Sequence, residues 1–332
     1  MPSPERLKLP KTPIENQPAK PTETDPASEL FERLKLKEQY LAQVKVLYAS
    51  HLLENFPATS DHPKPELGLT DIMGERHYLP KLADLRARLN NPETRQFIEK
   101  KYEQGFAKLL LVPFGLPLNT LIERYKQTLL KVRKETGIKA TDGSTLDLNE
   151  DDPLYVWDDL KQADNPQTPQ GKQLEYQVKN YDGQTKPERG GQTKQELLQQ
   201  DPDNAWQFLL IEDLPDLPAE NRGQTVAGRK QLEANKNAKE YLKLLQQDRQ
   251  YQGEQGLTPE ANLALYLTKL QEDHLAIDDY SGQGKANRLV GSYLSGVVPL
   301  FYWGRGGRQP NLSGRDPGDR GSHSGCRSSA RF

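Results

Sequence analysis

The sequence has little of what metal centres and disulfide-bonded folds require. Cys326 is the one cysteine among 332 residues, and the five histidines are scattered, with no two of them four residues apart. A single thiol excludes an intrachain disulfide and a cysteine-based zinc cluster, and the histidine spacing does not fit a metal site on a helix face. We therefore expect neither a metal nor a cofactor.

Long apolar runs and a charge excess are also missing. No stretch approaches the roughly eighteen consecutive apolar residues of a membrane-spanning helix, and the start, MPSPERLKLPK, lacks the apolar core of a signal peptide. The 45 basic and 47 acidic residues give a net charge of -2, so no overall field attracts nucleic acid. We expect a cytoplasmic protein with no membrane span and no nucleic-acid partner, while export by another route stays open.

The chain divides by composition into three parts. Residues 1–27 contain seven prolines, and we expect a disordered Pro-rich tail because such a segment buries too little to offset chain entropy. Residues 28–137 show apolar residues at helical spacing, which predicts a mostly helical region that forms a core or, alternatively, docks a partner. Residues 138–332 show short β-favouring runs, then helices, then a loop-like end from Val297, which together predict an α+β fold.

Capping residues and apolar spacing predict the individual elements. One long amphipathic helix is expected from the Asp25-Pro26 cap to Leu52, and other helices at Pro80–Leu89, at Pro92–Tyr102 after the cap Asn91, from the cap Asn119 to Gly137, at the capping box Thr193–Glu196, at Ala238–Gln247, and at Glu260–His274 after Thr258-Pro259. Strands are expected within Leu154–Trp157, Leu174–Tyr181 and Trp206–Ile211.

The last thirty residues differ from the rest of the chain. Trp303–Phe332 contains seven Gly, five Ser, six Arg and two Asp but no Lys or Glu, both of which are abundant upstream. The residues separate into two interleaved sets. The first, called here the frame set, contains rigid or ion-pairing residues suited to holding loop backbone: Trp303, Arg305, Arg308, Leu312, Asp316, Pro317, Arg320, Gly325, Arg327 and Arg331.

The second set, called here the variable set, contains residues whose codons, except for Arg315, are most simply reached from AAC or AAT by changing the first two bases. It comprises Tyr302, Gly304, Gly306, Gly307, Asn311, Ser313, Gly314, Arg315, Gly318, Asp319, Gly321, Ser322, His323 and Ser324. Cys326 belongs to the same codon class. Tyr, Ser, Gly and Asn are also the residues that paratopes favour, which suggests that the variable set forms a binding surface.

At these residues the chain resembles a known family. The run V-P-L-F-Y-W-G-R-G-G-R-Q-P-N-L-S-G-R-D-P-G-D-R from Val298, closing with G-C-R-S-S-A-R-F, is similar to the C-terminal variable region of target proteins of diversity-generating retroelements. Four upstream segments also resemble this family: 109–115, 211–218, 228–236 and 256–272. The resemblance covers roughly 105–332, and the departure is Ser328-Ser329 where members often have two alanines.

The resemblance implies a C-type lectin-like fold, related to that of formylglycine-generating enzymes, for residues 138–332. It also implies a variable region of about 298–332 that is rewritten by adenine-directed mutagenesis. The expected function is non-catalytic display of a binding surface to an unknown protein or glycan ligand. The resemblance does not identify the ligand or the oligomeric state.

Two alternatives come from other classes of function. One is a formylglycine-generating-type oxidase, which we do not expect because that chemistry depends on a pair of cysteines. The other is a helical interaction protein with a poorly ordered basic tail that binds nucleic acid, since six Arg and two Asp give that tail a charge of +4. The adjacent carboxylates Asp278 and Asp279 are expected to cap or form turns and not to act as general acid and base.

Overall fold

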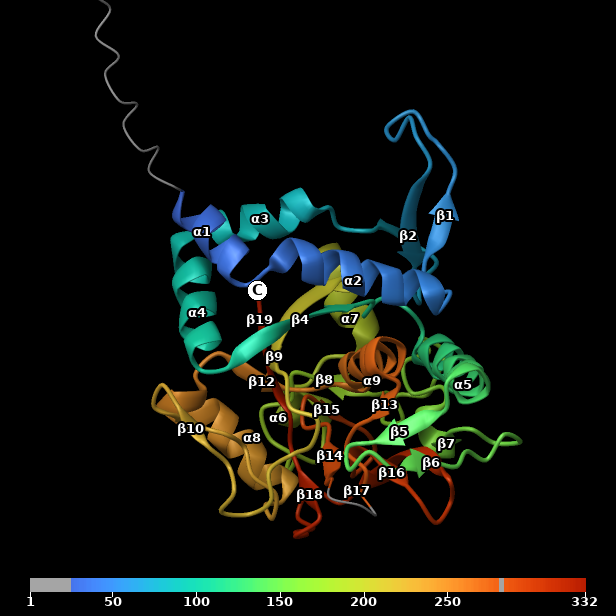
Figure 1. The fold of residues 1–332 in the computed structure, drawn as a ribbon, viewed down its shortest axis with the longest axis vertical. Coiled ribbons are helices and arrows are strands. Elements are labelled where there is room, and N and C mark those ends of the chain that lie inside the picture. The colour runs from blue at the N-terminus through green and yellow to red at the C-terminus, as the bar shows by residue number, and fades with distance from the viewer. Residues whose placement is uncertain (1–24, 281–283) are drawn as a thin grey trace, which may run out of the picture.

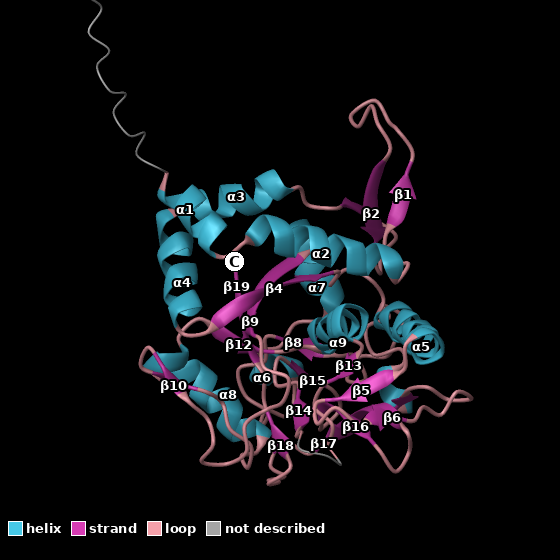
Figure 2. Ribbon diagram, in the orientation of Figure 1, coloured by secondary structure: helices cyan, strands magenta, loops and turns pink. Residues whose placement is uncertain are grey.

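The computed structural model describes residues 25–280 and 284–332, and it is an α+β structure with helices gathered around mainly antiparallel sheets. Figures 1 and 2 show helices α1 to α4 at one end of the molecule and strands β14 and β16 to β18 at the other. Most of the predicted Pro-rich tail, residues 1–24, lies outside the described residues. The end of that predicted tail is helical, because Asp25 caps a helix that begins at Pro26.

The single long helix expected from Pro26 to Leu52 is wrong, because the chain forms two helices instead. These are α1 (Pro26–Arg33) and α2 (Leu36–Ala49), and Lys35 between them has a left-handed backbone with φ of 50°. This break places Leu34 and Leu36 against the core, where both are buried. No glycine or proline marks the position, so local sequence does not signal it.

Three helix boundaries were predicted for the next helices, at Asn91, Asn119 and Gly137, and the first and third are confirmed. α3 (Leu82–Asn90) and α4 (Pro92–Glu103) are separated by Asn91, whose side chain accepts hydrogen bonds from two backbone N–H groups of α4. α5 (Leu118–Glu135) begins after Pro117 and not after Asn119, which is a correction to the expected cap. Gly137 follows the helix with φ of 78°, the left-handed stop that was predicted.

A four-stranded antiparallel sheet joins the beginning of the chain to its end. Its strands, in spatial order, are β12 (Glu254–Gly256), β19 (Ser328–Arg331), β9 (Gln207–Glu212) and β4 (Phe106–Val112). β4 belongs to the predicted helical region and the other three strands to the predicted lectin-like domain. The boundary expected at 137 therefore does not separate two cores, and one buried cluster contains residues from both sides of it.

The loop-like end predicted from Val297 is wrong. Residues 298–315 form the hairpin β16 (Val298–Gly304) and β17 (Gln309–Arg315) in a five-stranded sheet, with the order β18 (Ser324–Gly325), β14 (Ala286–Arg288), β16, β17, β7 (Tyr155–Val156). These strands are hard to recognise in the sequence. One face carries small polar residues, and the other carries only a few apolar residues, which are fully buried, so the apolar alternation typical of a strand is weak. The alternative of a poorly ordered basic tail is also wrong, because β16, β17 and β19 of the tail are paired in sheets.

The remaining elements are short, apart from two helices whose prediction is confirmed, α8 (Ala238–Gln247) and α9 (Pro259–Asp273). The others are β1 (Glu54–Phe56), β2 (Glu66–Thr70), β3 (Arg76–Tyr78), β5 (Ile138–Ala140), β6 (Thr145–Leu146), η1 (Asp158–Leu160), β8 (Glu175–Tyr176), α6 (Lys186–Arg189), α7 (Lys194–Gln200), η2 (Pro202–Ala205), β10 (Thr225–Val226), β11 (Arg229–Lys230), η3 (Arg249–Tyr251), β13 (Leu275–Ala276) and β15 (Ser292–Tyr293). Among the residues described, no helix is both long and apolar enough to cross a membrane.

A buried charge cluster ties the first helices to the last strand. Glu254 of β12 accepts hydrogen bonds from Lys101 of α4, at 2.8 Å, and from Arg229 of β11, at 2.7 and 2.8 Å, and all three side chains are fully buried. Ser328 of β19 donates to the same carboxylate. Burial acts to raise the pKa of Glu254, but the hydrogen bonds from Arg229 and the other donors outweigh it and lower the pKa overall.

This cluster gives the first prediction. Glu254→Ala would leave Lys101 as an uncompensated buried charge and Arg229 with Glu212 as its one remaining carboxylate partner. We expect it to lower the free energy of unfolding by about 3–5 kcal/mol in urea titrations. The control is Glu99→Ala, which breaks a half-exposed pair with Arg33 and should cost no more than about 1 kcal/mol. Equal losses in the two variants would contradict the assigned role of the cluster.

Candidate functional site

The variable set gathers around one hollow in the surface. A cavity of about 510 Å³, called here the display cavity, opens beside the five-stranded sheet at the end of the molecule opposite α1 to α4. Eight variable-set residues line it: Tyr302, Ser313, Gly314, Arg315, Gly321, Ser322, His323 and Ser324. Tyr280, Ala286, Leu300 and Arg320 complete the lining. Residues that are up to 22 positions apart in the sequence thus share one surface.

Strand alternation separates the two sets along the hairpin, except at Gly314, which shares the inward face of β17 with Leu312. Tyr302 of β16 lies opposite Asn311 of β17, and Leu300 lies opposite Ser313, on the partly exposed face. Phe301, Trp303 and Leu312 point to the other face and are buried. Because successive side chains of a strand point to opposite faces, replacing the outward residues leaves the inward packing unchanged.

An aromatic group forms one wall of the display cavity. The rings of Tyr280 and Tyr302 lie 5.3 Å apart, and the ring of His323 lies edge-on to that of Tyr280 at 5.7 Å. Tyr280 is 42% exposed although it is a large aromatic residue. Burial raises the pKa of the Tyr302 hydroxyl, so this group stays a neutral donor and acceptor at ordinary pH. Sequence reasoning missed Tyr280, which lies outside the tail that composition singled out.

Arg288 supports the loop that closes the cavity, and sequence reasoning missed it as well. Its guanidinium is buried and donates to the Ser324 hydroxyl at 3.0 Å and to the Asp319 carbonyl at 2.7 Å. Burial lowers its pKa, and the nearby Arg315 lowers it further. In the sequence Arg288 is a single arginine followed by Leu289-Val290, and an exposed arginine in a strand would have the same local sequence.

Two frame-set arginines are held by the adjacent carboxylates Asp278 and Asp279. Arg327 donates to Asp278 at 2.9 and 2.7 Å, and Arg305 donates to Asp279 at 2.8 Å. Tyr266 of α9 donates a third hydrogen bond to Asp278. The carboxylates therefore anchor the hairpin and the last strands. The expectation that they only cap or form turns is corrected, because both are fully buried and ion-paired.

The rest of the frame set fixes the loops, with one exception. Arg320 binds Glu240 of α8 at 2.6 Å and Arg308 binds Asp147 at 3.1 Å, while Asp316 accepts from the Gly318 N–H at 2.7 Å in the turn that contains buried Pro317. Buried Gly325 sits where a Cβ would lie 3.2 Å from Leu217. Arg331 is the exception, because it lines a different cavity.

The other variable-set residues lie around the display cavity without lining it. Gly306 and Gly307 are exposed in the turn between β16 and β17, and a Cβ on Gly306 would meet nothing within 4 Å. Gly304 and Asn311 lie at partly exposed positions of the hairpin, and Gly318 and Asp319 lie in the exposed loop that follows it.

Two members of the variable set do not have the space that a variable position needs. A Cβ on Gly314 would lie 2.6 Å from the Val297 side chain and 3.0 Å from the Trp157 ring, so Gly314 lines the cavity with backbone only. Ser324 is buried and accepts from Arg288. We therefore reassign both residues to the fixed part of the structure.

Cys326 is not placed to react. Its side chain is fully buried between β18 and β19, and burial raises the pKa of the thiol far above its ordinary value, so it does not form the nucleophilic thiolate at neutral pH. In residues 25–280 and 284–332 no group of three or more His, Cys, Asp or Glu side chains is placed to hold a metal ion.

Comparison with known proteins gives no family for the chain. No protein-family model, no curated protein and no solved structure matches it. The display cavity therefore has to be interpreted from its own geometry and from the sequence resemblance.

The contrast between two glycines gives the second prediction. Gly306→Ser should change the free energy of unfolding by no more than about 0.5 kcal/mol, because the added atoms face open space. Gly314→Ser should cost about 1–3 kcal/mol, because Val297 and Trp157 must move. Thermal unfolding of the two variants compares the positions directly, and equal shifts in Tm would show that the division between open and closed positions is wrong.

Proposed function

We propose that this protein is a non-catalytic ligand-binding protein of the diversity-generating-retroelement type, with a C-type lectin-like domain in residues 138–332. The binding surface is the display cavity with the adjoining hairpin turn. The observation that carries this proposal is the agreement between two independent divisions of the tail. Residues grouped by codon type are partly or fully exposed, with the exceptions of Ser324 and Cys326, and they alternate with frame residues most of which are buried or ion-paired.

The chemistry of the display cavity favours a polar ligand. Serine, glycine and histidine at its rim offer hydrogen bonds, and the Tyr280 and Tyr302 rings offer flat apolar area at low entropic cost. An exposed arginine, Arg315, pairs with Asp319 at 3.4 Å and adds a charged group at the edge. A protein loop or a glycan fits this mixture. Because many variable-set positions hold glycine or serine, this variant presents few large side chains and is expected to bind weakly.

The two alternative functions receive less support. An oxidase of the formylglycine-generating type needs a reactive thiol, and the one cysteine of this chain is buried with a raised pKa. A nucleic-acid-binding tail needs several unpaired positive charges on the surface. Five of the six arginines of the tail, Arg305, Arg308, Arg315, Arg320 and Arg327, are each ion-paired with an aspartate or glutamate, and the sixth, Arg331, lines a separate cavity.

Sequencing of this gene across one population tests the proposal and is the third prediction. Substitutions should be concentrated at the exposed slots, such as Tyr302, Gly306, Ser313, Ser322 and His323. The controls are the interleaved frame positions Trp303, Leu312 and Arg327, which should not change. They are matched controls because they lie in the same short stretch of DNA and differ from the variable positions only in their structural role.

The neighbouring DNA provides the matching readout. A near-repeat of the last hundred or so bases, with adenines at the codons of the exposed slots, should lie beside a reverse transcriptase gene. Substitutions spread evenly over slots and frame positions, without such a repeat, would refute the proposal.

A further inference from the structure

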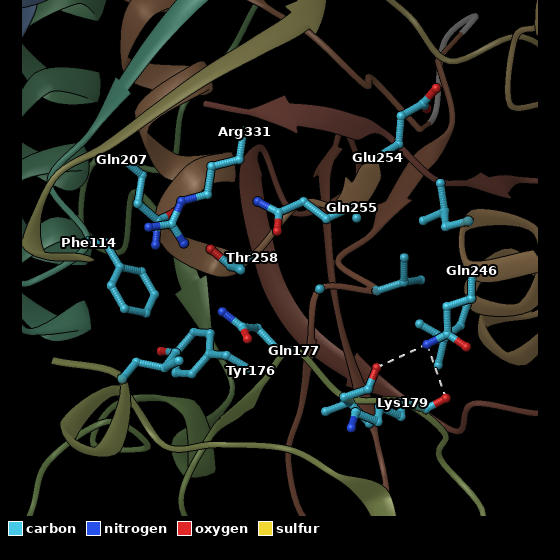
Figure 3. Close-up of a pocket in the computed structure, with 17 residues that line it drawn as sticks. Phe114, Tyr176, Gln177, Lys179, Gln207, Gln246, Glu254, Gln255, Thr258 and Arg331 are labelled. Atoms are coloured by element: carbon cyan, nitrogen blue, oxygen red, sulfur yellow. Dashed lines mark hydrogen bonds between the residues drawn. The ribbon is translucent and has the colours of Figure 1, made fainter. Parts of the chain in front are cut away.

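A second cavity, of about 420 Å³, lies on the four-stranded sheet, away from the variable set. It is open to solvent on one side and is lined by residues of β8, β9, β12 and β19, of α7 and α8, and of the start of α9. Figure 3 shows Arg331, Gln207, Gln255, Gln177 and Thr258 around its centre, with the Phe114 and Tyr176 rings to one side. A cavity of this size suits a small metabolite, and the question is which chemistry its lining selects.

Arg331 brings a positive charge that no carboxylate in the described chain neutralises within ion-pair distance. Its guanidinium donates to the Asn204 side-chain oxygen, a neutral acceptor. Burial lowers the pKa of Arg331, nearby Arg88 lowers it further, and Asp201 opposes the shift only from a distance. Arg189 and Arg229, by contrast, each bind a glutamate with two hydrogen bonds, whereas buried Arg288, like Arg331, donates only to neutral acceptors.

Three glutamine amides face the same space without partners. The side chains of Gln177, Gln207 and Gln255 form no hydrogen bond with any part of the chain that the structure describes, and no dashed line reaches them in Figure 3. Gln207 is only 5% exposed, so its amide is largely removed from water. Gln255 is half-buried and Gln177 is exposed, so Gln207 is the one shielded amide of the three. Buried polar groups are nearly always hydrogen-bonded in native proteins, so the Gln207 amide is the group that a bound partner would satisfy.

The backbone at Gln177 adds a third observation. Its φ of 55° is left-handed, a conformation that costs energy for a residue with a side chain. This conformation belongs to the turn after β8 that carries the Gln177 amide toward Thr258 in Figure 3.

The remaining lining residues leave the charge of Arg331 uncancelled. Glu254 is the one carboxylate among the residues that line the second cavity, and its oxygens already accept from Lys101, Arg229 and Ser328. The Phe114 and Tyr176 rings pack edge to face at 5.0 Å and form an apolar side. The lining thus combines the Arg331 guanidinium, the exposed Lys179, four glutamine amides, of which only that of Gln246 is hydrogen-bonded within the described chain, and an apolar wall.

We propose that the second cavity binds a small organic anion whose carboxylate or phosphate group contacts Arg331 and whose other polar atoms contact Gln177, Gln207 and Gln255. A planar guanidinium suits both anionic groups because it donates two parallel hydrogen bonds to either. This site is separate from the display cavity, and none of the residues that line it belongs to the variable set.

Calorimetric titration of the full chain with inorganic phosphate and with glutarate tests this site and is the fourth prediction. At least one of the two probes should bind saturably at one site with a Kd of about 1 mM. Arg331→Gln should weaken that binding tenfold or more, because the charge-assisted bonds are lost. Gln255→Leu should weaken it severalfold without removing the charge, and circular dichroism confirms that each variant is folded.

The matched control is Arg315→Gln, which removes an exposed arginine from the display cavity, away from the second cavity, and should leave the affinity unchanged. Phosphate binding alone, or glutarate binding alone, supports the site and identifies the anionic group. The proposal is overturned if neither probe binds, if Arg331→Gln binds as tightly as the parent, or if Arg315→Gln abolishes binding.

Discussion

The pairing of the adjacent buried carboxylates Asp278 and Asp279 with Arg327 and Arg305 is the interaction on which the candidate binding surface depends. Asp278 joins α9, through Tyr266, to the last strand, and Asp279 joins the same segment to the turn after β16. The backbone adds two hydrogen bonds, from the Trp303 N–H to the Asp278 carbonyl and from the Tyr280 N–H to the Trp303 carbonyl. Charged hydrogen bonds in a buried setting hold geometry without needing bulky apolar side chains.

This arrangement explains how a segment rich in glycine and serine keeps a defined shape. The apolar contribution of the tail is small in number but fully buried, since Phe301, Trp303 and Leu312 are each no more than 1% exposed. Arginines supply the remaining restraint by binding carboxylates on distant elements. The outward positions of the hairpin are therefore free to vary, whereas Gly314, on the inward face, is closed by Val297 and Trp157.

The sequence predicted local features well and long-range pairing poorly. Caps such as Asn91-Pro92 and Thr258-Pro259 mark helix starts because they satisfy backbone groups locally, and both were predicted. The break at Lys35 and the strands of the tail depend on what packs against them, which a single sequence does not state. The frame set was inferred from residue type. The loop-supporting role of Arg288 and the position of Arg331 in the second cavity were not predicted, because the role of an arginine depends on which carboxylates the fold brings near it.

The central claim is that the exposed variable-set positions do not contribute to the stability of the fold, whereas the frame positions do. Its most direct test is the fraction of cooperatively unfolding members in two libraries of equal size, one randomised at Tyr302, Gly306, Ser313, Ser322 and His323 and the other at Trp303, Arg305, Leu312, Arg320 and Arg327. The account predicts that most members of the first library unfold cooperatively near the parent Tm and that few members of the second do. Similar fractions in the two libraries would contradict it.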